Sequence, residues 1–160
     1  MATKKTSKLE CAVAHALDVL GDYWTMMILR DLMIFGGTRR FDSLCEGLDI
    51  SRNILTERLR VLVEKEIVRK VPITEGARRM EYKLSRKGWE LMPTLLSIGQ
   101  WCARWSEGSD VEAYQYIERE TGELVFVPGA TTKNGKPLGP ADIKLIPKTQ
   151  EAKEYLEKYR

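Results

Sequence analysis

Residues 50–68 read ISRNILTERLRVLVEKEIV, and this stretch decides the fold. Its apolar residues recur on the 3.6-residue period of a helix, at Ile54, Leu55, Leu59, Leu62 and Val63. Ser51 precedes the helix and can cap it, because a serine hydroxyl accepts a free backbone N–H of the first turn. The opposite face is polar and carries Arg52, Asn53, Thr56, Glu57 and Arg60. The stretch alone therefore indicates an amphipathic helix.

The polar face of this helix has the residue types that read DNA. An α-helix fits the major groove, where arginine binds the edge of guanine and asparagine binds the edge of adenine. A DNA recognition helix over residues 51–66 is one interpretation. A solvated surface helix is the other, since charged faces are common on exposed helices. The neighbouring segments must decide between the two.

Three helices are predicted before this stretch. The first covers Leu9–Leu20, and the second covers Tyr23–Ile34 with Asp22 as its cap. A short third helix begins at about Asp42, with Asp42 itself as the cap, and a brief turn leads from it into residues 51–66. A short helix, a turn and a longer helix with a polar outer face make up the helix-turn-helix layout.

A basic β-hairpin is predicted after this layout. Val68–Ile73 reads as an edge strand, where Pro72 is tolerated, and Met80–Leu84 reads as a second strand. The loop at 74–80 carries two adjacent arginines, residues 78 and 79, so the hairpin can serve as a wing that contacts a DNA backbone or minor groove. The alternative is an exposed hairpin with solvated arginines.

Two predicted helices are unusually apolar. Residues 9–20 carry apolar side chains on more than one face, and residues 86–105 carry them around most of the circumference. One domain cannot bury all of these side chains, which favours a homodimer with both helices in its interface. Pro93 lacks a backbone N–H and can kink the longer helix near its start.

Composition and charge also indicate a partner. The 160 residues are 43% hydrophobic and 31% charged, typical of a globular protein with one domain and a small appendage. Residues 51–88 hold 11 lysines and arginines against 5 acidic residues, a net charge of +6, whereas residues 107–160 have a net charge of −2. Positive charge that clusters in this way is suited to binding a polyanion.

Without a signal-peptide pattern or a membrane-length apolar run, we expect a cytoplasmic, nucleoid-associated protein.

The order of these elements resembles the HxlR family of winged-helix transcription regulators. The stretches that carry the resemblance are Cys11, LDVLGDYWTMMILRDL (17–32), RRFDSL (39–44), ISRNILTERLRVLVEKEIVRK (50–70) and EYKLSRKGWELMPTLLSIGQW (81–101). The resemblance implies a mainly α fold with a small β-wing, a winged helix-turn-helix. It also implies a homodimer, through helices 9–20 and 86–105, that binds near-palindromic double-stranded operator DNA, most often as a repressor.

Family roles can be carried over to individual residues of this sequence. The resemblance places five side chains in the major groove: Ser51, Arg52, Asn53, Thr56 and Arg60. It places four arginines on phosphates or in the minor groove: Arg39, Arg40, Arg78 and Arg79. Phosphate contacts supply affinity, and contacts to base edges supply specificity.

Cys11 occupies the position where several regulators of this family sense oxidants or electrophiles. A helix N-terminus lowers the pKa of a thiol, and His15 lies four residues further on the same face. A small-molecule or electrophile effector is one interpretation of Cys11, and a purely structural cysteine is the other.

The chain is expected to comprise a flexible N-terminus (1–8), a winged-helix DNA-binding and dimerisation domain (9–106) and a small β-rich extension (107–160). In the extension, strands are expected at 113–117, 124–127 and 142–146, with a terminal helix. Its glycine turns are similar to the knuckles of the zinc ribbon found in some family members. Without a cysteine or histidine the extension has no ligand set for zinc, so neither a metal nor a cofactor is expected.

An enzyme is not expected from this sequence, and no catalytic residue is assigned. One histidine and three scattered cysteines supply no set of nucleophile, base and orienting group. The main alternative to a DNA-binding regulator is a winged helix that serves as a protein-interaction module. The charge of +6 over residues 51–88 and the polar face with Arg52 and Asn53 favour DNA.

Overall fold

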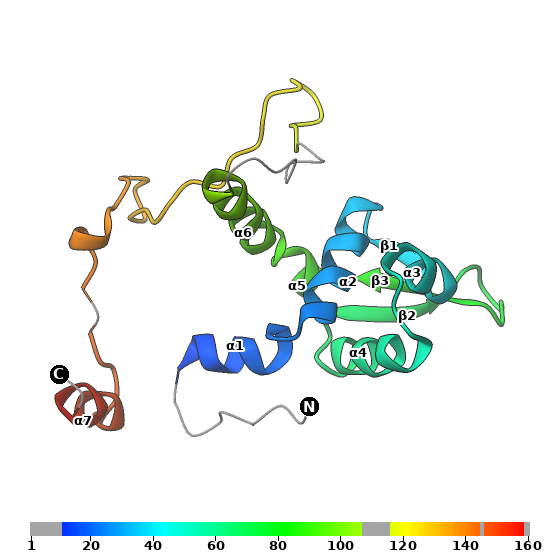
Figure 1. Cartoon of the computed structure of the whole chain (residues 1–160), viewed down its shortest axis with the longest axis horizontal. Coiled ribbons are helices and arrows are strands. Elements are labelled where there is room, and N and C mark those ends of the chain that lie inside the picture. The colour runs from blue at the N-terminus through cyan, green and yellow to red at the C-terminus, as the bar shows by residue number, and fades with distance from the viewer. Residues whose placement is uncertain (1–10, 107–115, 145, 159–160) are drawn as a thin grey trace. The chain divides into compact units, whose positions relative to one another are not determined.

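A computed structural model describes residues 11–106, 116–144 and 146–158 of the chain. The chain divides into two units, Met1–Glu107 and Gly108–Arg160, and each is considered by itself (Figure 1). The expected N-terminal segment at 1–8 lies outside the described residues. So does the start of the first expected helix, whose described part is α1, Ala12–Leu20.

Three helices form the centre of the first unit (Figure 1): α2, Tyr23–Ile34, α3, Phe41–Leu48, and α4, Arg52–Glu64. Their bounds agree with the prediction from apolar periodicity. Asp22 caps α2 by accepting a hydrogen bond from the backbone N–H of Thr25 at 3.2 Å. Ser51 caps α4 through the backbone N–H of Ile54 at 3.4 Å, as its position indicated.

The prediction that Asp42 caps α3 is wrong. Arg40 holds the N-cap position and makes no side-chain cap, while Asp42 lies in the first turn, where a carboxylate favourably faces the positive end of the helix dipole. The turn from α3 to α4 is closed by Asp49 in the left-handed conformation, at φ 50°. Aspartate tolerates this conformation better than most residues do. This turn sets the direction in which α4 leaves α3.

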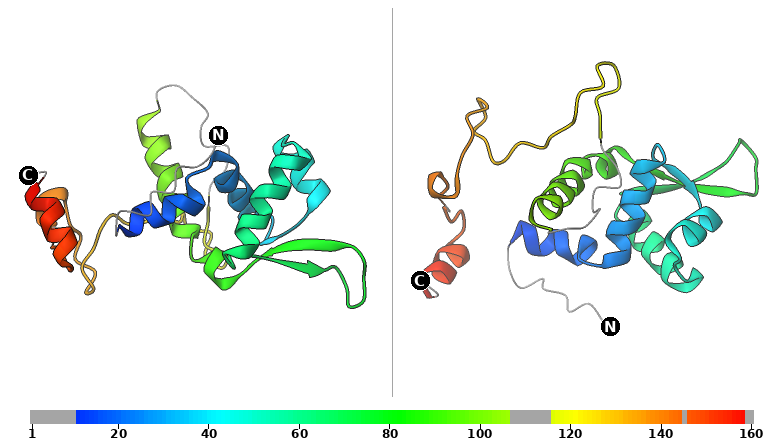
Figure 2. Two further views of the ribbon diagram at one scale, coloured as in Figure 1. Left: turned by 90° about the horizontal axis from the view of Figure 1, so that it is seen from below. Right: turned by 45° about the horizontal axis from the view of Figure 1, so that its top comes forward.

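A three-stranded antiparallel sheet completes the winged helix, with the order β1-β3-β2. The strands are β1, Thr38–Arg40, β2, Val68–Pro72, and β3, Met80–Leu84. β2 lies at an edge, as Pro72 suggested, and Figure 2 shows the β2–β3 hairpin extending beyond the helices. The sequence did not reveal β1, because three residues are too few to show an alternating pattern. Its pairing with β3 brings Arg39 opposite Tyr82.

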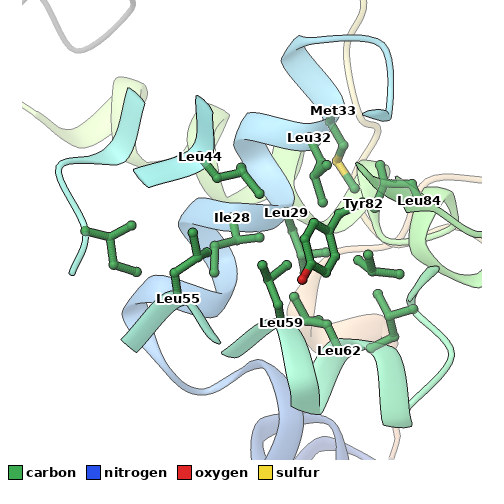
Figure 3. Close-up of a cluster of buried hydrophobic side chains, with 13 residues drawn as sticks. Ile28, Leu29, Leu32, Met33, Leu44, Leu55, Leu59, Leu62, Tyr82 and Leu84 are labelled. Carbon is green, nitrogen blue, oxygen red and sulfur yellow. The ribbon is translucent and has the colours of Figure 1, made fainter. Parts of the chain in front are cut away.

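The core lies between α2, α3, α4 and β3 (Figure 3). α4 buries Leu55, Leu59 and Leu62 completely or almost so, and each of these residues belongs to the apolar stripe of the sequence. The other fully buried apolar side chains come from the neighbouring elements: Ile28, Leu29, Leu32, Leu44 and Val68. Because one face of α4 is fixed in this core, its opposite face must point into solvent.

The expected helix at 86–105 is divided into α5, Arg86–Trp89, and α6, Met92–Trp105. Pro93 lies in the first turn of α6. It has no N–H to donate to the carbonyl of Trp89, so a continuous helix would lose a hydrogen bond at this point. The proline therefore breaks the helix rather than only bending it.

The second unit has less regular structure than the sequence predicted. Over its described residues it contains a short 3-10 helix, η1, Pro140–Asp142, and a terminal helix, α7, Gln150–Lys158. A single β-bridge, Ile117 with Leu124, stands where two extended strands were expected, and a second bridge joins Thr131 and Pro137. The strand at 142–146 does not form at residues 142–144 and 146, and residues 113–115 of the first expected strand lie outside the description.

Local hydrogen bonds explain the short pairing in the second unit. The Glu118 carboxylate accepts the backbone N–H groups of Glu120 and Thr121 at 3.0 and 2.6 Å, and these bonds lower its pKa. The Thr132 hydroxyl accepts the backbone N–H of Lys136 at 3.1 Å. Such side-chain bonds fold the chain into tight turns and compete with a β-ladder.

A buried ion pair fastens β1 and α3 to α2. Arg39 Nε lies 3.2 Å from Asp31 Oδ2, and these side chains are 19% and 5% exposed. The two atoms are not aligned for a hydrogen bond, so charge attraction joins them. Arg39 also donates from Nη2 to the carbonyl oxygen of Ser43 at 2.9 Å and lies 3.9 Å above the Phe35 ring. One guanidinium thus holds α2, the loop after it and α3.

Substitution of Arg39 by alanine is expected to destabilise the first unit by about 3 kcal/mol, because the buried Asp31 carboxylate loses its nearer partner and keeps only Arg30, whose Nη2 lies 4.0 Å from Asp31 Oδ1. Urea unfolding followed by circular dichroism measures the change. Arg40→Ala is the matched control, since Arg40 is the exposed neighbour, and its effect is expected to stay within about 0.5 kcal/mol. Equal effects of the two substitutions would contradict the anchoring role of Arg39.

Candidate nucleic-acid interface

The leading end of α4 presents a polar surface to solvent. Ser51, Arg52, Asn53 and Thr56 are all exposed, while the next residue in the stripe, Leu55, is fully buried. These four predicted site residues therefore lie together at one end of one helix. The burial of the leucine face fixes their direction, so the surface is preformed rather than assembled by a loop.

Arg52 is held in place by α3. Its Nη1 donates to Asp42 Oδ1 at 2.7 Å, and its guanidinium lies 4.8 Å from the centre of the Phe41 ring. Both partners of the pair are exposed, at 69% and 71% of their side-chain area. The hydrogen bond and the charge of Asp42 raise the pKa of Arg52. Asp42 is thus a member of the site that the sequence did not indicate as one.

The other polar side chains at the start of α4 differ in the hydrogen bonds that they make within the protein. The Thr56 hydroxyl donates to the carbonyl of Arg52 at 2.7 Å, and the Ser51 hydroxyl serves as the helix cap. Asn53 has no hydrogen-bond partner for its amide within the described part of the chain. Its amide therefore keeps both the donor and the acceptor that bind an adenine edge.

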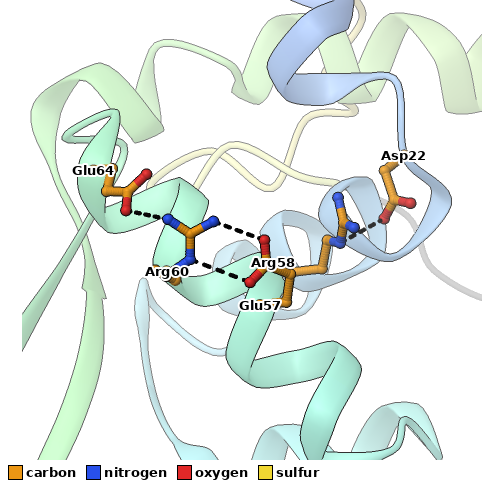
Figure 4. Close-up of polar contacts among 5 residues, drawn as sticks. All are labelled: Asp22, Glu57, Arg58, Arg60 and Glu64. Atoms are coloured by element: carbon orange, nitrogen blue, oxygen red, sulfur yellow. Dashed lines mark hydrogen bonds and ion pairs between the residues drawn. The ribbon is translucent and has the colours of Figure 1, made fainter. Parts of the chain in front are cut away.

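Arg60 lies further along α4 and is bound by two carboxylates of its own helix (Figure 4). Its Nη2 donates to Glu57 Oε1 at 2.8 Å, and its Nη1 donates to Glu64. The two hydrogen bonds raise the pKa of Arg60, and the bond from Arg60 lowers the pKa of Glu57. Arg58 points to the other side, and its Nε lies 3.6 Å from Oδ1 of Asp22, the cap of α2 (Figure 4).

The four arginines expected on phosphates or in the minor groove divide into two kinds. Arg40, Arg78 and Arg79 are exposed, the last two in the loop of the β2–β3 hairpin. Arg39 is in the buried pair with Asp31. The structure therefore gives Arg39 a place in the fold, and its contact with DNA stays a prediction.

The apolar side chains of α1 and α6 form a second exposed feature of this unit. Both helices lie on the side of α2 that is away from the β2–β3 hairpin (Figures 1 and 2). Five large apolar residues on them are half or more exposed: Val13, Leu17, Ile98, Trp101 and Trp105. Cys11 is exposed directly before α1, and its carbonyl accepts the backbone N–H of His15 at 3.0 Å.

No group of three or more potential metal ligands occurs within residues 11–106, 116–144 and 146–158. Over the same ranges, every helix is too short or too polar to cross a membrane.

The chain is similar to known helix-turn-helix proteins. The family model for the HxlR-like helix-turn-helix matches residues 19–110, more than half of the chain. An HTH-type transcriptional regulator of Mycobacterium tuberculosis is 39% identical over 90 residues, which are 56% of this chain and 56% of that protein. The chain thus spans about half the length of this curated relative.

Solved structures extend the similarity beyond the winged unit. The crystal structure of PA1607, described as a candidate transcription factor, is 35% identical with a TM-score of 0.79 and covers 89% of this chain and 99% of its own. The reduced form of the transcriptional regulator YodB from Bacillus subtilis is 30% identical with a TM-score of 0.53, covering 64% of this chain and all of its own. YodB is also known in a quinone-bound form, with 29% identity and a TM-score of 0.51 over 59% of this chain and 99% of its own.

These comparisons confirm the fold class and the family predicted from the sequence. The proteins matched are described as regulators and transcription factors, which agrees with the expectation that the chain is not an enzyme. The match of the family model includes the winged helix of α2, α3, α4 and the three strands, together with α5 and α6. The chain belongs to the HxlR-like helix-turn-helix family.

Proposed function

We propose that this chain is a sequence-specific DNA-binding transcriptional regulator that acts as a homodimer in the cytoplasm. The observation that carries the proposal is the solvent-facing group of Ser51, Arg52, Asn53 and Thr56 at the leading end of α4. A helix end of this composition fits the major groove. Family membership and the net charge of +6 over residues 51–88 support the same function. Repression, the commoner action of such regulators, is the expected effect on transcription.

Each part of the surface has a different proposed role on DNA. Residues at the start of α4 contact base edges, and Arg40, Arg78 and Arg79 contact phosphates or the minor groove. The hairpin loop at 74–80 is suited to this because it extends beyond the helices (Figure 2). Arg60 also faces solvent, but its two carboxylate partners reduce the positive charge that it offers to DNA. A winged helix that binds only proteins remains the competing function, and DNA affinity separates the two.

The two units of the chain have different proposed roles. Residues 9–106 bind DNA and dimerise, and residues 107–160 form an appended unit. Alignment with PA1607 over 89% of this chain includes much of that appendage, which supports treating it as part of the regulator rather than a foreign sequence.

Asn53→Ala is expected to weaken binding to a duplex selected by the protein from a random library by about 1–3 kcal/mol, because one bidentate base contact is lost.

Arg79→Ala is expected to weaken binding to all duplexes and to reduce the slope of log K against log salt by about 0.9, because one phosphate contact is lost. Fluorescence anisotropy over a salt series measures both, with Arg119→Ala in the appended unit as the control. If the wild-type protein shows no salt-dependent affinity for any duplex, the interaction-module function replaces the present one.

The proposed homodimer uses the exposed apolar faces of α1 and α6. Side chains such as Trp101 and Trp105, which are 64% and 71% exposed, are stabilised when a second copy covers them. A two-fold dimer would also place two α4 helices for the two halves of a near-palindromic operator.

Trp101→Asp is expected to shift the protein from dimer to monomer, because a charge at a buried interface position is costly. Light scattering after size-exclusion chromatography measures the mass. Ile54→Asp, which adds the same charge at an exposed apolar site on α4, should leave the mass unchanged. A monomeric wild-type protein, or a dimeric Trp101→Asp variant, would refute this interface.

Cys11 supports a second proposed property, a response to oxidants or electrophiles. The thiol is exposed directly before α1, and the similar regulator YodB is known in reduced and quinone-bound forms. Exposure makes the thiol accessible to reagents, which is a requirement for sensing.

If Cys11 is the sensor, diamide should lower the affinity of the wild-type protein for its selected duplex at least about tenfold, a change of about 1.4 kcal/mol. Cys11→Ser should abolish the response. Cys45→Ser is the matched control, because Cys45 is partly buried against the core and should leave the response intact. Equal responses of wild type and Cys11→Ser would exclude Cys11 as the sensor.

A further inference from the structure

The pair of Asp42 and Arg52 joins the two helices of the helix-turn-helix at the surface proposed to face DNA. Asp42 belongs to the first turn of α3, and Arg52 is the first residue of α4. Arg52 Nη1 and Asp42 Oδ1 are 2.7 Å apart, and the Phe41 ring lies 4.8 Å below the guanidinium. An acidic residue on such a surface lowers the affinity for DNA, since it repels the phosphate backbone, so its presence needs another explanation.

The bond to Asp42 leaves Arg52 able to bind a base. A guanidinium has five N–H donors in a planar fork, and Asp42 uses one of them. Two parallel N–H groups remain for the O6 and N7 atoms of guanine. The bond and the ring beneath also hold the plane of the guanidinium, which reduces the conformational freedom that a bidentate contact would otherwise remove.

Asp42 has different effects on the binding of a phosphate and of a guanine edge to Arg52. A phosphate that approaches Arg52 brings a negative charge close to the Asp42 carboxylate, and like charges at this distance repel. The edge of guanine carries no net charge, so it does not meet this repulsion. An arginine without such a neighbour can bind any phosphate it reaches, which strengthens binding to every sequence and distinguishes none.

We propose that Asp42 is a specificity-determining residue that positions Arg52 for a guanine edge and disfavours its contact with phosphates. This proposal rests on the DNA-binding function proposed above. Asp42 would supply a repulsive interaction with phosphates. Specific interfaces commonly combine such repulsion of the wrong partner with attractive contacts to the right one. Because both side chains are exposed, the pair is weak in itself, and its effect is expected in selectivity rather than in the stability of the fold.

The test compares Asp42→Asn with Glu46→Gln. Glu46 lies one turn further along α3, is exposed and carries the same charge, but it takes part in none of the ion pairs found among the described residues. The probes are a duplex selected by the wild-type protein from a random library and a scrambled duplex of equal length. Affinities for both are measured by anisotropy over a salt series.

For Asp42→Asn, we expect tighter binding to the scrambled duplex and a ratio of selected to scrambled affinity that falls by roughly three- to tenfold. The salt slope on the scrambled duplex should become steeper by about 0.9, the signature of one added phosphate contact. Repeating the selection with this variant should lose the preference for guanine at one base pair of each half-site. Arg52→Ala should lose the preference at the same base pair. Glu46→Gln should change both affinities by a similar factor and keep the ratio.

Three results would overturn the inference. One is an unchanged affinity ratio in Asp42→Asn, and another is an equal fall of the ratio in Glu46→Gln. The third is a further fall when Asp42→Asn is added to Arg52→Ala, since Asp42 would then act without Arg52. Circular dichroism checks folding, and Asp42→Ser serves as the second variant with the same expected results. A wild-type protein that enriches no duplex would instead refute the DNA-binding function itself, and the inference with it.

Discussion

The packing of α4 on α2 is the constraint on which the rest of this structure depends. Leu55, Leu59 and Leu62 are buried in the core shared with Ile28, Leu29 and Leu32 (Figure 3). A helix with one face fixed in this way has no freedom to rotate, so its polar residues must face solvent in a defined arrangement. Removal of a core leucine would cost about 2–5 kcal/mol and loosen the surface as well as the fold. The stability of the core and the geometry of the proposed reading surface therefore have the same physical origin.

Around this core, aspartates hold three of the arginines. Asp22 meets Arg58, Asp31 meets Arg39 and Asp42 meets Arg52, and each pair joins two different elements. The pairs differ in burial, from the nearly buried Asp31 to the exposed Asp42, and their consequences differ accordingly. A buried pair cannot be broken without a large loss of stability, whereas loss of an exposed pair costs the fold little. The net charge of +6 thus overstates the positive charge that is free to meet a phosphate.

Local sequence patterns predicted the elements in which apolar residues recur over several helical turns or along a strand. The apolar stripe of α4, its Ser51 cap and the bounds of α2 could all be read from periodicity and capping chemistry. β1 was missed because its three residues form a strand only through pairing with β3. The split between α5 and α6 was only partly foreseen, because Pro93 permits either a kink or a break. In the second unit, alternation suggested strands, but the bonds of Glu118 and Thr132 stabilise turns instead. For the candidate site, residue type indicated the polar end of α4. The partners of Arg39 and Arg52 lie 8 and 10 positions earlier in the chain, on different elements, so these pairs depend on tertiary packing that the spacing does not indicate.

The claim that α4 and the wing together read DNA is tested most directly by mapping backbone amide shifts by NMR as a selected duplex is added. We expect the largest changes at residues 51–56 and in the hairpin loop at 74–80, because these groups would contact the bases and the backbone. Changes on the exposed faces of α1 and α6 should be small, since that surface is proposed to be covered in the dimer. Shifts concentrated on α1 and α6, with residues 51–56 unaffected, would contradict the proposed orientation of this protein on DNA.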